Sequence, residues 1–258
     1  MAAISGRVVG LVPARAGSRR IAGKNVRPLY GHPLLAYTIG AALDSGVFDA
    51  VIVSTDSPEI ASLARHYGAD VPFLRPADMA GDLSPDIEWV RFTVSRLLQE
   101  GLAFDAFSIL RPTSPLRQAA TIGRAWAEFA EDREADSLRA VEPCGQHPAK
   151  MWLLDGARMR PLLDDQGADP PWHSRPYQAL APVFVQNASL EMAWVRVLEE
   201  TGTISGRVIR PFRCEGYEGF DLNDEADWWV LERLVADGVA KLPPVRVRSV
   251  KEEARNHA

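Results

Sequence analysis

Cysteine is scarce in this sequence, which has 2 cysteines, Cys144 and Cys214, among 258 residues. Neither lies in a CxxC pair or near a Cys/His cluster, so the pattern argues against a zinc site. It favours two reduced thiols over a single disulfide. Long apolar runs are also missing. The first spans only Val8 to Val12, too short for a signal-peptide core or for the about 18 residues of a spanning helix. We therefore expect a soluble, cytoplasmic protein with no membrane segment.

An excess of positive charge is missing too. Lys and Arg number 29 against 34 Asp and Glu, which gives a formal net charge of −5. Proteins that bind a nucleic-acid polymer usually carry the opposite balance, so we expect no such partner, although net charge is compatible with a local basic pocket. The length and the hydrophobic share of 47% are those of a globular protein whose core needs no disulfide or metal.

Short β-branched runs alternate with helical patterns over the first half of the chain. Expected strands cover 7–12, 50–55, 104–110 and 137–141, and expected helices cover 34–43, 57–67, 86–100 and 118–131. This rhythm is typical of βαβ units. It predicts an α/β fold built on a mostly parallel sheet with helices on both faces.

The rhythm stops at about residue 142. Prolines are frequent from there to residue 182, and few helical signals remain. Regular patterns return as expected strands over 183–195 and 206–212 and a helix over 224–237. We predict a single domain over 1–244, interrupted by an insert over about 143–182, and a flexible tail over 245–258.

The turn after the first strand, residues 13–25, concentrates positive charge on Arg15, Arg19, Arg20 and Lys24. Ligands of open α/β sheets bind at the carboxyl ends of the strands. Gly17 allows the backbone to approach a ligand, and successive amides there can form an anion nest. A solvated basic loop is the alternative, but its place directly after a buried strand favours a polyphosphate site.

This loop matches neither common phosphate-binding motif. Gly17 and Gly23 are too far apart for a Walker A loop, and Asn25 stands where a Ser or Thr would hold Mg²⁺. A GxGxxG fingerprint is also missing, so a dinucleotide dehydrogenase is a poor fit.

Six ordered blocks span nearly the whole chain. They are LVPARAGSRRIAGKN with GHPLLAYTI, IVSTDSPEIA, FLRPADMAGD, LRPTSPLR, HPAK and FDLNDEADW. Together they closely resemble the acylneuraminate cytidylyltransferase family, the CMP-sialic acid synthetases. The resemblance implies a Rossmann-like fold and Mg²⁺-dependent transfer of a cytidylyl group from CTP to a sugar hydroxyl, with release of pyrophosphate. It also implies a homodimer formed through a small insert, for which 143–182 is the candidate.

The resemblance assigns nucleotide-binding residues in two blocks. The expected triphosphate cradle consists of Arg15, Ser18, Arg19 and Lys24 with the backbone near Gly17, and the expected nucleotide-binding residues add Ala14, Asn25 and Arg75. Arg19 stands where the family commonly has a lysine. Arg75 has an alternative role as a surface arginine that anchors a loop. The stretch 81–86, which in the family lies against base and ribose, matches loosely, so a base other than cytosine stays open as an alternative.

The last block implies a metal site. Relatives commonly carry Asp-x-Asp here, whereas this chain has Asp221 followed by Asn223. Both are expected Mg²⁺ ligands, and Asp221 is grouped with Arg15 and Lys24 as catalytic. Asp224 either completes the site or caps the following helix. Asp56 either lies near the metal or caps the helix after it.

The acceptor side departs most from the family. Expected acceptor-binding residues are Arg111, which replaces a usual glutamine, with Lys150, Arg175, Gln186 and Asn187. Because the segment 185–189 lacks the arginine and glycine typical of sialate-activating members, three acceptors stay open: a nonulosonic acid, another sugar or sugar phosphate, and a non-sugar. A catalytically weak nucleotide-binding protein is a further alternative. The nucleophile would be the acceptor's hydroxyl, and His147 is either a base or a structural residue.

Overall fold

The computed structural model describes residues 6–17 and 21–247. Most of the predicted tail, from residue 248 onward, lies outside this range. The chain forms two compact units, one comprising residues 141–186 and the other the remaining sequence on both sides of it. The larger unit holds the sheet that the sequence predicts.

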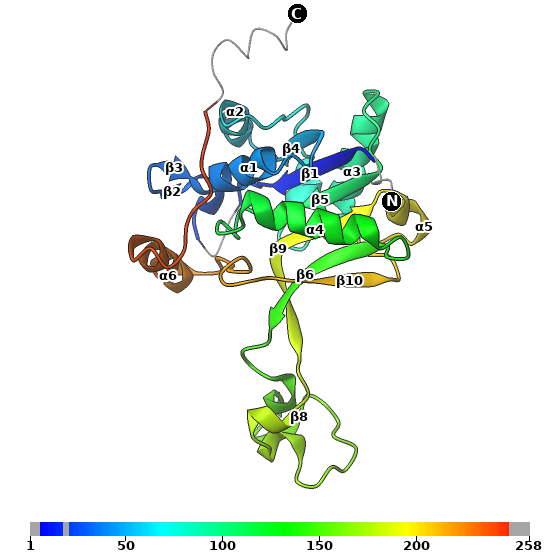
Figure 1. Ribbon diagram of the computed structural model, residues 1–258, viewed down its shortest axis with the longest axis vertical. Helices are drawn as coiled ribbons and strands as arrows, with labels where there is room; N and C mark the ends of the chain where they lie inside the picture. The colour runs from blue at the N-terminus through cyan, green and yellow to red at the C-terminus, as the bar shows by residue number, and fades with distance from the viewer. Residues whose placement is uncertain (1–5, 18–20, 248–258) are drawn as a thin grey trace, which may run out of the picture. The chain divides into compact units, whose positions relative to one another are not determined.

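A six-stranded sheet runs through the larger unit in the order β10-β6-β9-β5-β1-β4 (Figure 1). The strands are β1 (Val8–Pro13), β4 (Ala50–Ser54), β5 (Ala106–Ile109), β6 (Ser137–Pro143), β9 (Phe184–Trp194) and β10 (Ile209–Arg213). Strand β1 pairs in parallel with both β4 and β5, and β9 pairs antiparallel with β5. A two-residue ladder joins β2 (Pro28–Leu29) to β3 (His32–Pro33).

Helices cover both faces of this sheet. Helices α1 (Leu34–Asp44), α2 (Pro58–His66) and α4 (Ala119–Glu131) contribute Ile39, Ile60 and Phe129 to one buried cluster. Helices α3 (Asp86–Gln99) and α5 (Arg196–Glu200) contribute Trp89 and Leu198 to the cluster on the other face. Since successive strand residues point to opposite faces, the central strands supply apolar side chains to both clusters. The α/β class and the two covered faces are therefore confirmed, and the sheet is mixed but mostly parallel.

Local sequence explains where two of the helices begin. Ser57 accepts a hydrogen bond from the Ile60 amide at 3.2 Å, and Pro58 follows at the first helical position of α2. Helix α6 (Glu225–Ala236) begins with a capping box in which Asp224 accepts from the Asp227 amide at 3.0 Å. Its buried face, with Trp228 and Leu231, joins a third apolar cluster.

The expected elements are present, with small shifts at their ends. The largest concerns the strand expected over 206–212, which begins only at Ile209. The amides of Arg207 and Val208 donate to the Asp136 carboxylate instead, and Gly206 has a left-handed φ of 68°. The aspartate therefore satisfies backbone donors that a longer strand would pair.

The smaller unit contains a hairpin of β7 (Trp152–Asp155) and β8 (Arg158–Pro161) and several 3₁₀ turns. Its loop-rich character follows from its prolines, which interrupt regular hydrogen bonding. Across the described residues, none of the helices has the length and apolar character needed to cross a membrane.

Candidate active site

A cavity of about 490 Å³ opens at the carboxyl ends of β1 and β5. The chain continues from β1 to β4 on one side and later reaches β5 on the other, so the cavity lies at the switch point where open α/β sheets bind ligands. Its charged lining consists of Arg15, Lys24, Arg75, Arg111, Asp82 and Asp86. Cations outnumber carboxylates in this lining, which suits an anionic ligand.

Backbone contacts fix the loop that follows β1. The Ala14 amide donates to Ser54 O at 3.0 Å, and the Ala16 amide donates to the Asp56 carboxylate at 2.9 Å. Asn25 donates its side-chain amide to Arg15 O at 3.1 Å. The capping role considered for Asp56 is wrong, because Ser57 caps α2 and Asp56 instead anchors the basic loop.

Lys24 joins the two parts of the chain in which the sequence predicts catalytic residues. Its Nζ donates to the carbonyl oxygen of Leu222 at 2.7 Å, and the Leu222 amide donates to Thr113 O at 2.8 Å. Leu222 directly follows Asp221. The acidic segment before α6 therefore contacts two residues of the cavity lining, Lys24 and Thr113, although its own residues are not part of that lining.

Asp221 has an oxygen that suits a cation. Its Oδ1 is buried and has no hydrogen-bond partner in the described part of the chain. Such an orphan is costly unless something absent from the protein compensates it. Asn223 is exposed and donates its backbone amide to Asp227 at 2.7 Å. Asp224 has the capping role expected as one of its alternatives.

The metal site would need ligands beyond the protein. Among the described residues, no three His, Cys, Asp or Glu side chains gather in a way that could hold a metal. Mg²⁺ in phosphoryl-transfer sites commonly uses one or two carboxylates together with substrate phosphates and waters. Asp221 next to a basic cavity fits this arrangement.

Arg75 is a buried residue, not a surface arginine. It is 6% exposed, and its guanidinium donates to Ser54 Oγ at 3.0 Å and Ser54 O at 2.9 Å. It stacks on Trp89, with 4.6 Å from Cζ to the ring centroid. Burial lowers the pKa of Arg75 to about 10. Arg75 therefore anchors its loop to β4 and also lines the cavity.

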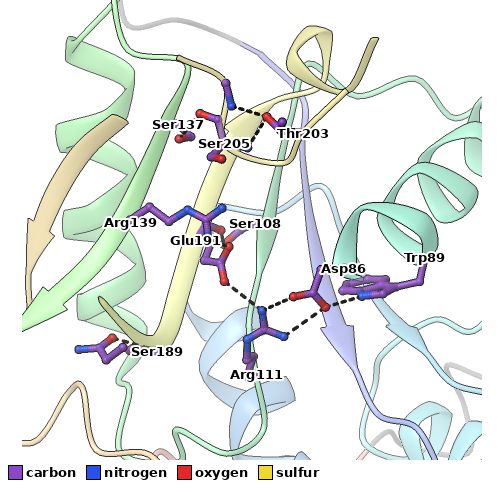
Figure 2. A network of polar contacts seen from close by, with 12 residues as sticks. Asp86, Trp89, Ser108, Arg111, Ser137, Arg139, Ser189, Glu191, Thr203 and Ser205 are labelled. Carbon is purple, nitrogen blue, oxygen red and sulfur yellow. Dashed lines mark hydrogen bonds and ion pairs between the residues drawn. The ribbon is translucent and has the colours of Figure 1, made fainter. Parts of the chain in front are cut away.

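Arg111 stands at the cavity wall in contact with two carboxylates. Its Nη2 donates to Asp86 Oδ2 at 2.6 Å and to Glu191 Oε1 at 3.0 Å (Figure 2). Burial lowers the pKa of Arg111, but the hydrogen bond and charge of Asp86 outweigh burial, so its pKa is raised. Burial raises the pKa of Asp86, but the contacts with Arg111 outweigh it and its pKa is lowered. Both groups are therefore held in their charged forms.

The predicted acceptor residues divide between the two units. Lys150 and Arg175 lie in the smaller unit, where Lys150 Nζ donates to Arg175 O at 2.7 Å. Gln186 is exposed at the end of the same unit. Asn187 belongs to the larger unit, and its Oδ1 accepts from the Ser189 amide at 3.1 Å. Arg111 therefore lines the same cavity as the nucleotide-side residues. For Lys150, Arg175 and Gln186, a role in acceptor binding stays a prediction.

The remaining predicted residues lie in the basic loop. Ala14 is buried, and Gly17 is exposed with open space where a Cβ would lie. Ser18 and Arg19 fall outside the described residues. Arg15 reaches the 80–82 loop, where its guanidinium donates to Ala80 O at 3.3 Å.

The sequence analysis included Asp82 and Asp86 only as part of the stretch 81–86, without a role of their own, and it did not consider Trp89 or Glu191 as site residues. Glu191 carried a signal, because it is an isolated acid within the otherwise apolar run 190–195 and a buried acid requires a partner. Asp86 and Trp89 resemble the ordinary first turn of an amphipathic helix. Nothing in their spacing distinguishes them from surface and core positions.

Comparison with known proteins identifies sequence relatives. A sequence model of the family described as Cytidylyltransferase matches residues 9–100. The CMP-N,N'-diacetyllegionaminic acid synthase of Legionella pneumophila is 34% identical over 233 residues, which cover 89% of this chain and 96% of that protein. The N-acylneuraminate cytidylyltransferase of Escherichia coli is 40% identical over 116 residues, which cover 45% of this chain and 26% of that protein.

A solved structure shares the fold. The structure of CMP:2-keto-3-deoxy-manno-octonic acid synthetase complexed with CTP superimposes with a TM-score of 0.64 and covers 90% of this chain and 99% of that one. The sequence identity is 14%, so this similarity concerns the fold alone.

The fold and the basic cavity at its switch point are those of a protein that binds an anionic ligand such as a nucleotide. The sequence relationship then specifies the class, because the Legionella relative is matched over nearly its whole length. This chain belongs to the acylneuraminate cytidylyltransferase family, the CMP-sialic acid synthetases, and is a cytidylyltransferase.

Proposed function

We propose that this enzyme transfers CMP from CTP to a hydroxyl of a nonulosonic, sialic-acid-like sugar acid. The acceptor oxygen forms a bond to the α-phosphorus of CTP, the bond from that phosphorus to the bridging oxygen breaks, and pyrophosphate leaves. The contact of Lys24 with Leu222 carries the proposal, because Lys24 lines the cavity and joins the basic loop to the segment of Asp221. Phosphoryl-type transfer requires such positioning and charge neutralisation more than covalent chemistry.

The nucleotide side of the site rests on cations that line the cavity. Arg15, Lys24 and Arg75 would neutralise the triphosphate, and Asn25 would hold the loop in place through Arg15 O. The backbone of Ala14 and Gly17 and the side chains of Ser18 and Arg19 complete the proposed cradle.

We infer that Asp221 holds a Mg²⁺ ion when CTP is bound, with Asn223 as a second ligand. The buried, unpartnered Oδ1 of Asp221 supports the first assignment. Mg²⁺ would neutralise charge on the phosphates as pyrophosphate leaves. Asn223 supplies an amide where relatives have a carboxylate, so the site would carry one negative charge fewer.

The acceptor side would use Arg111 at the cavity wall, with Lys150, Arg175, Gln186 and Asn187 as further contacts. Support differs among them. Arg111 lines the same cavity as the nucleotide residues. The other four rest on the family resemblance. Lys150 donates a hydrogen bond to Arg175 O and Arg175 donates one to Pro170 O, both within the smaller unit.

A homodimer formed through the smaller unit is part of the proposal. In the β7–β8 hairpin, the paired residues Leu154 and Met159 are 80% and 57% exposed. An isolated two-stranded hairpin is marginally stable in water, and apolar exposure of this kind favours a covering partner. A dimeric mass by light scattering that becomes monomeric in Leu154→Lys would support it, and a monomeric wild-type mass would contradict it. We also infer that the enzyme is cytoplasmic.

Pyrophosphate release tests the proposal. Each of the common nucleoside triphosphates is combined with nonulosonic acids and with sugar 1-phosphates, with and without Mg²⁺. We expect release only with CTP, a nonulosonic acid and Mg²⁺ together. Release with a sugar 1-phosphate and no sugar acid would overturn the acceptor, and release without Mg²⁺ would overturn the metal. No release with any pair, alongside measurable CTP binding, would favour a nucleotide-binding protein.

A further inference from the structure

Four charged side chains form a continuous row across the sheet. Asp86 lies at the start of α3, Arg111 two residues after the end of β5, Glu191 on β9 and Arg139 on β6 (Figure 2). Arg111 Nη2 contacts Asp86 at 2.6 Å and Glu191 at 3.0 Å, and the other oxygen of Glu191 accepts from Arg139. Positive and negative groups alternate along the row, and its formal charges cancel.

The two members of this row that lie away from the cavity are more buried than the two that line it. The Asp86 and Arg111 side chains are 32% and 25% exposed, whereas those of Arg139 and Glu191 are 13% and 6% exposed. Asp86 and Arg111 line the cavity, and the other two do not. Glu191 can therefore influence a ligand in the cavity only through its contact with Arg111.

Glu191 restricts the position of Arg111. A guanidinium has five N–H donors in a rigid plane, and here one nitrogen faces two carboxylates that come from different elements. Asp86 alone would hold the long arginine side chain from one side only, through one short contact at 2.6 Å and one long contact at 3.5 Å. Glu191, held in turn by Arg139 and by its own strand, supplies the second fixed point. Donors on Nη1, whose contact with Asp86 is 3.5 Å, retain capacity for a ligand.

We propose that Glu191, supported by Arg139, is a positioning residue that orients Arg111 for the acceptor. This inference rests on the proposed function. Because Asp86 and Glu191 already balance the charge of Arg111, the acceptor group that it reads is a neutral amide or hydroxyl, not the acceptor carboxylate. The charge of Glu191 therefore aids acceptor binding by fixing geometry. If Arg111 bound the carboxylate, the same charge would oppose acceptor binding.

Kinetics of neutralised variants separate these roles. Glu191→Gln should raise the KM for the nonulosonic acid by about three- to tenfold, with the KM for CTP changed less than about twofold. In an Arg111→Gln background the same substitution should add nothing, because its effect passes through Arg111. An unchanged or lowered acceptor KM, or an equal effect in both backgrounds, would overturn the proposal.

A charge-balanced variant covers the case in which Glu191→Gln folds poorly, since that change leaves Arg139 buried beside an uncharged neighbour. Arg139→Gln/Glu191→Gln removes both charges, so we expect its thermal midpoint near that of the wild type with the acceptor KM still raised. A normal acceptor KM in this double variant would show a purely structural role. If the wild type releases no pyrophosphate with any acceptor, both the proposed function and this inference fail; if it is active, these variants test the inference alone.

Discussion

Arg15 and Asp82 form an ion pair at the edge of the nucleotide cavity, with Nη2 and Oδ1 2.8 Å apart. Arg15 is the residue expected to meet the triphosphate, and both partners line the cavity. Their side chains are 33% and 31% exposed, so water screens the pair and its contribution is small. A triphosphate would compete with one carboxylate for this guanidinium.

Asp82→Asn should therefore lower the KM for CTP, by about two- to fivefold, because it removes the competing charge. Steady-state kinetics at low ionic strength measure the change. Asp78→Asn, an exposed aspartate of the same loop, is the control and should leave the KM unchanged. A higher KM in Asp82→Asn would mean that Asp82 assists nucleotide binding, contrary to this account.

Lys24→Met should reduce kcat/KM for CTP by about 100-fold, since it removes a cation that bridges the basic loop and the segment after Asp221. Lys24→Arg retains the charge and should be impaired far less. The thermal midpoint serves as the control for folding. Activity of Lys24→Met within about threefold of the wild type would remove Lys24 from the catalytic group.

Substitution of Asp221 should affect turnover, whereas substitution of Asp224 should affect stability. Asp221→Ala should abolish Mg²⁺-dependent turnover. It should lower stability little, because Asp221 Oδ1 has no hydrogen-bond partner among the described residues. Asp224→Ala should lower the free energy of unfolding by about 1 kcal/mol and keep turnover, because Asp224 caps α6. Asp224→Asn, which preserves a capping side chain, is the matched control. Reversal of the two phenotypes would reassign the metal ligand.

The Asp86–Arg111 pair should make stability depend on pH in the acid range. The pKa of Asp86 is lowered, since Arg111 outweighs the effect of burial. A lowered carboxyl pKa contributes stability that is complete above the ordinary value of about 4 and is lost as the pH falls through the lowered value. Asp86→Asn should therefore lower the free energy of unfolding by about 1–2 kcal/mol at pH 7.

Thermal unfolding between about pH 3 and pH 7 measures this difference between wild type and Asp86→Asn. The two midpoints should converge at the acid end, where the wild-type carboxyl is protonated. A constant offset at every pH would show that packing, and not the charge of Asp86, accounts for the loss.

The architecture followed from the sequence because its signals are local. Alternating β-branched runs and amphipathic patterns predicted the strands and helices, and Asp224 carried a readable capping signal. The basic loop was predictable for the same reason, since its charges lie close together in the sequence. The family blocks then associated that loop with Asp221.

The charged row escaped prediction because it is assembled from four separate elements. Arg111 was assigned to the acceptor, but nothing in its own block shows that Asp86 and Glu191 neutralise it. Contacts across the sheet depend on strand order and register, which bring together residues that are far apart in the sequence. The smaller unit posed a similar difficulty, since prolines predict loops without indicating what they contact.

The fate of the α-phosphate tests the central claim most directly. CTP labelled with ³²P at the α position is incubated with Mg²⁺ and a nonulosonic acid, and the products are separated. We predict that the label moves into a CMP–sugar conjugate and that no label leaves CTP without the acceptor. Label released as CMP at the same rate with and without acceptor, or retained in CTP throughout, would contradict the assignment.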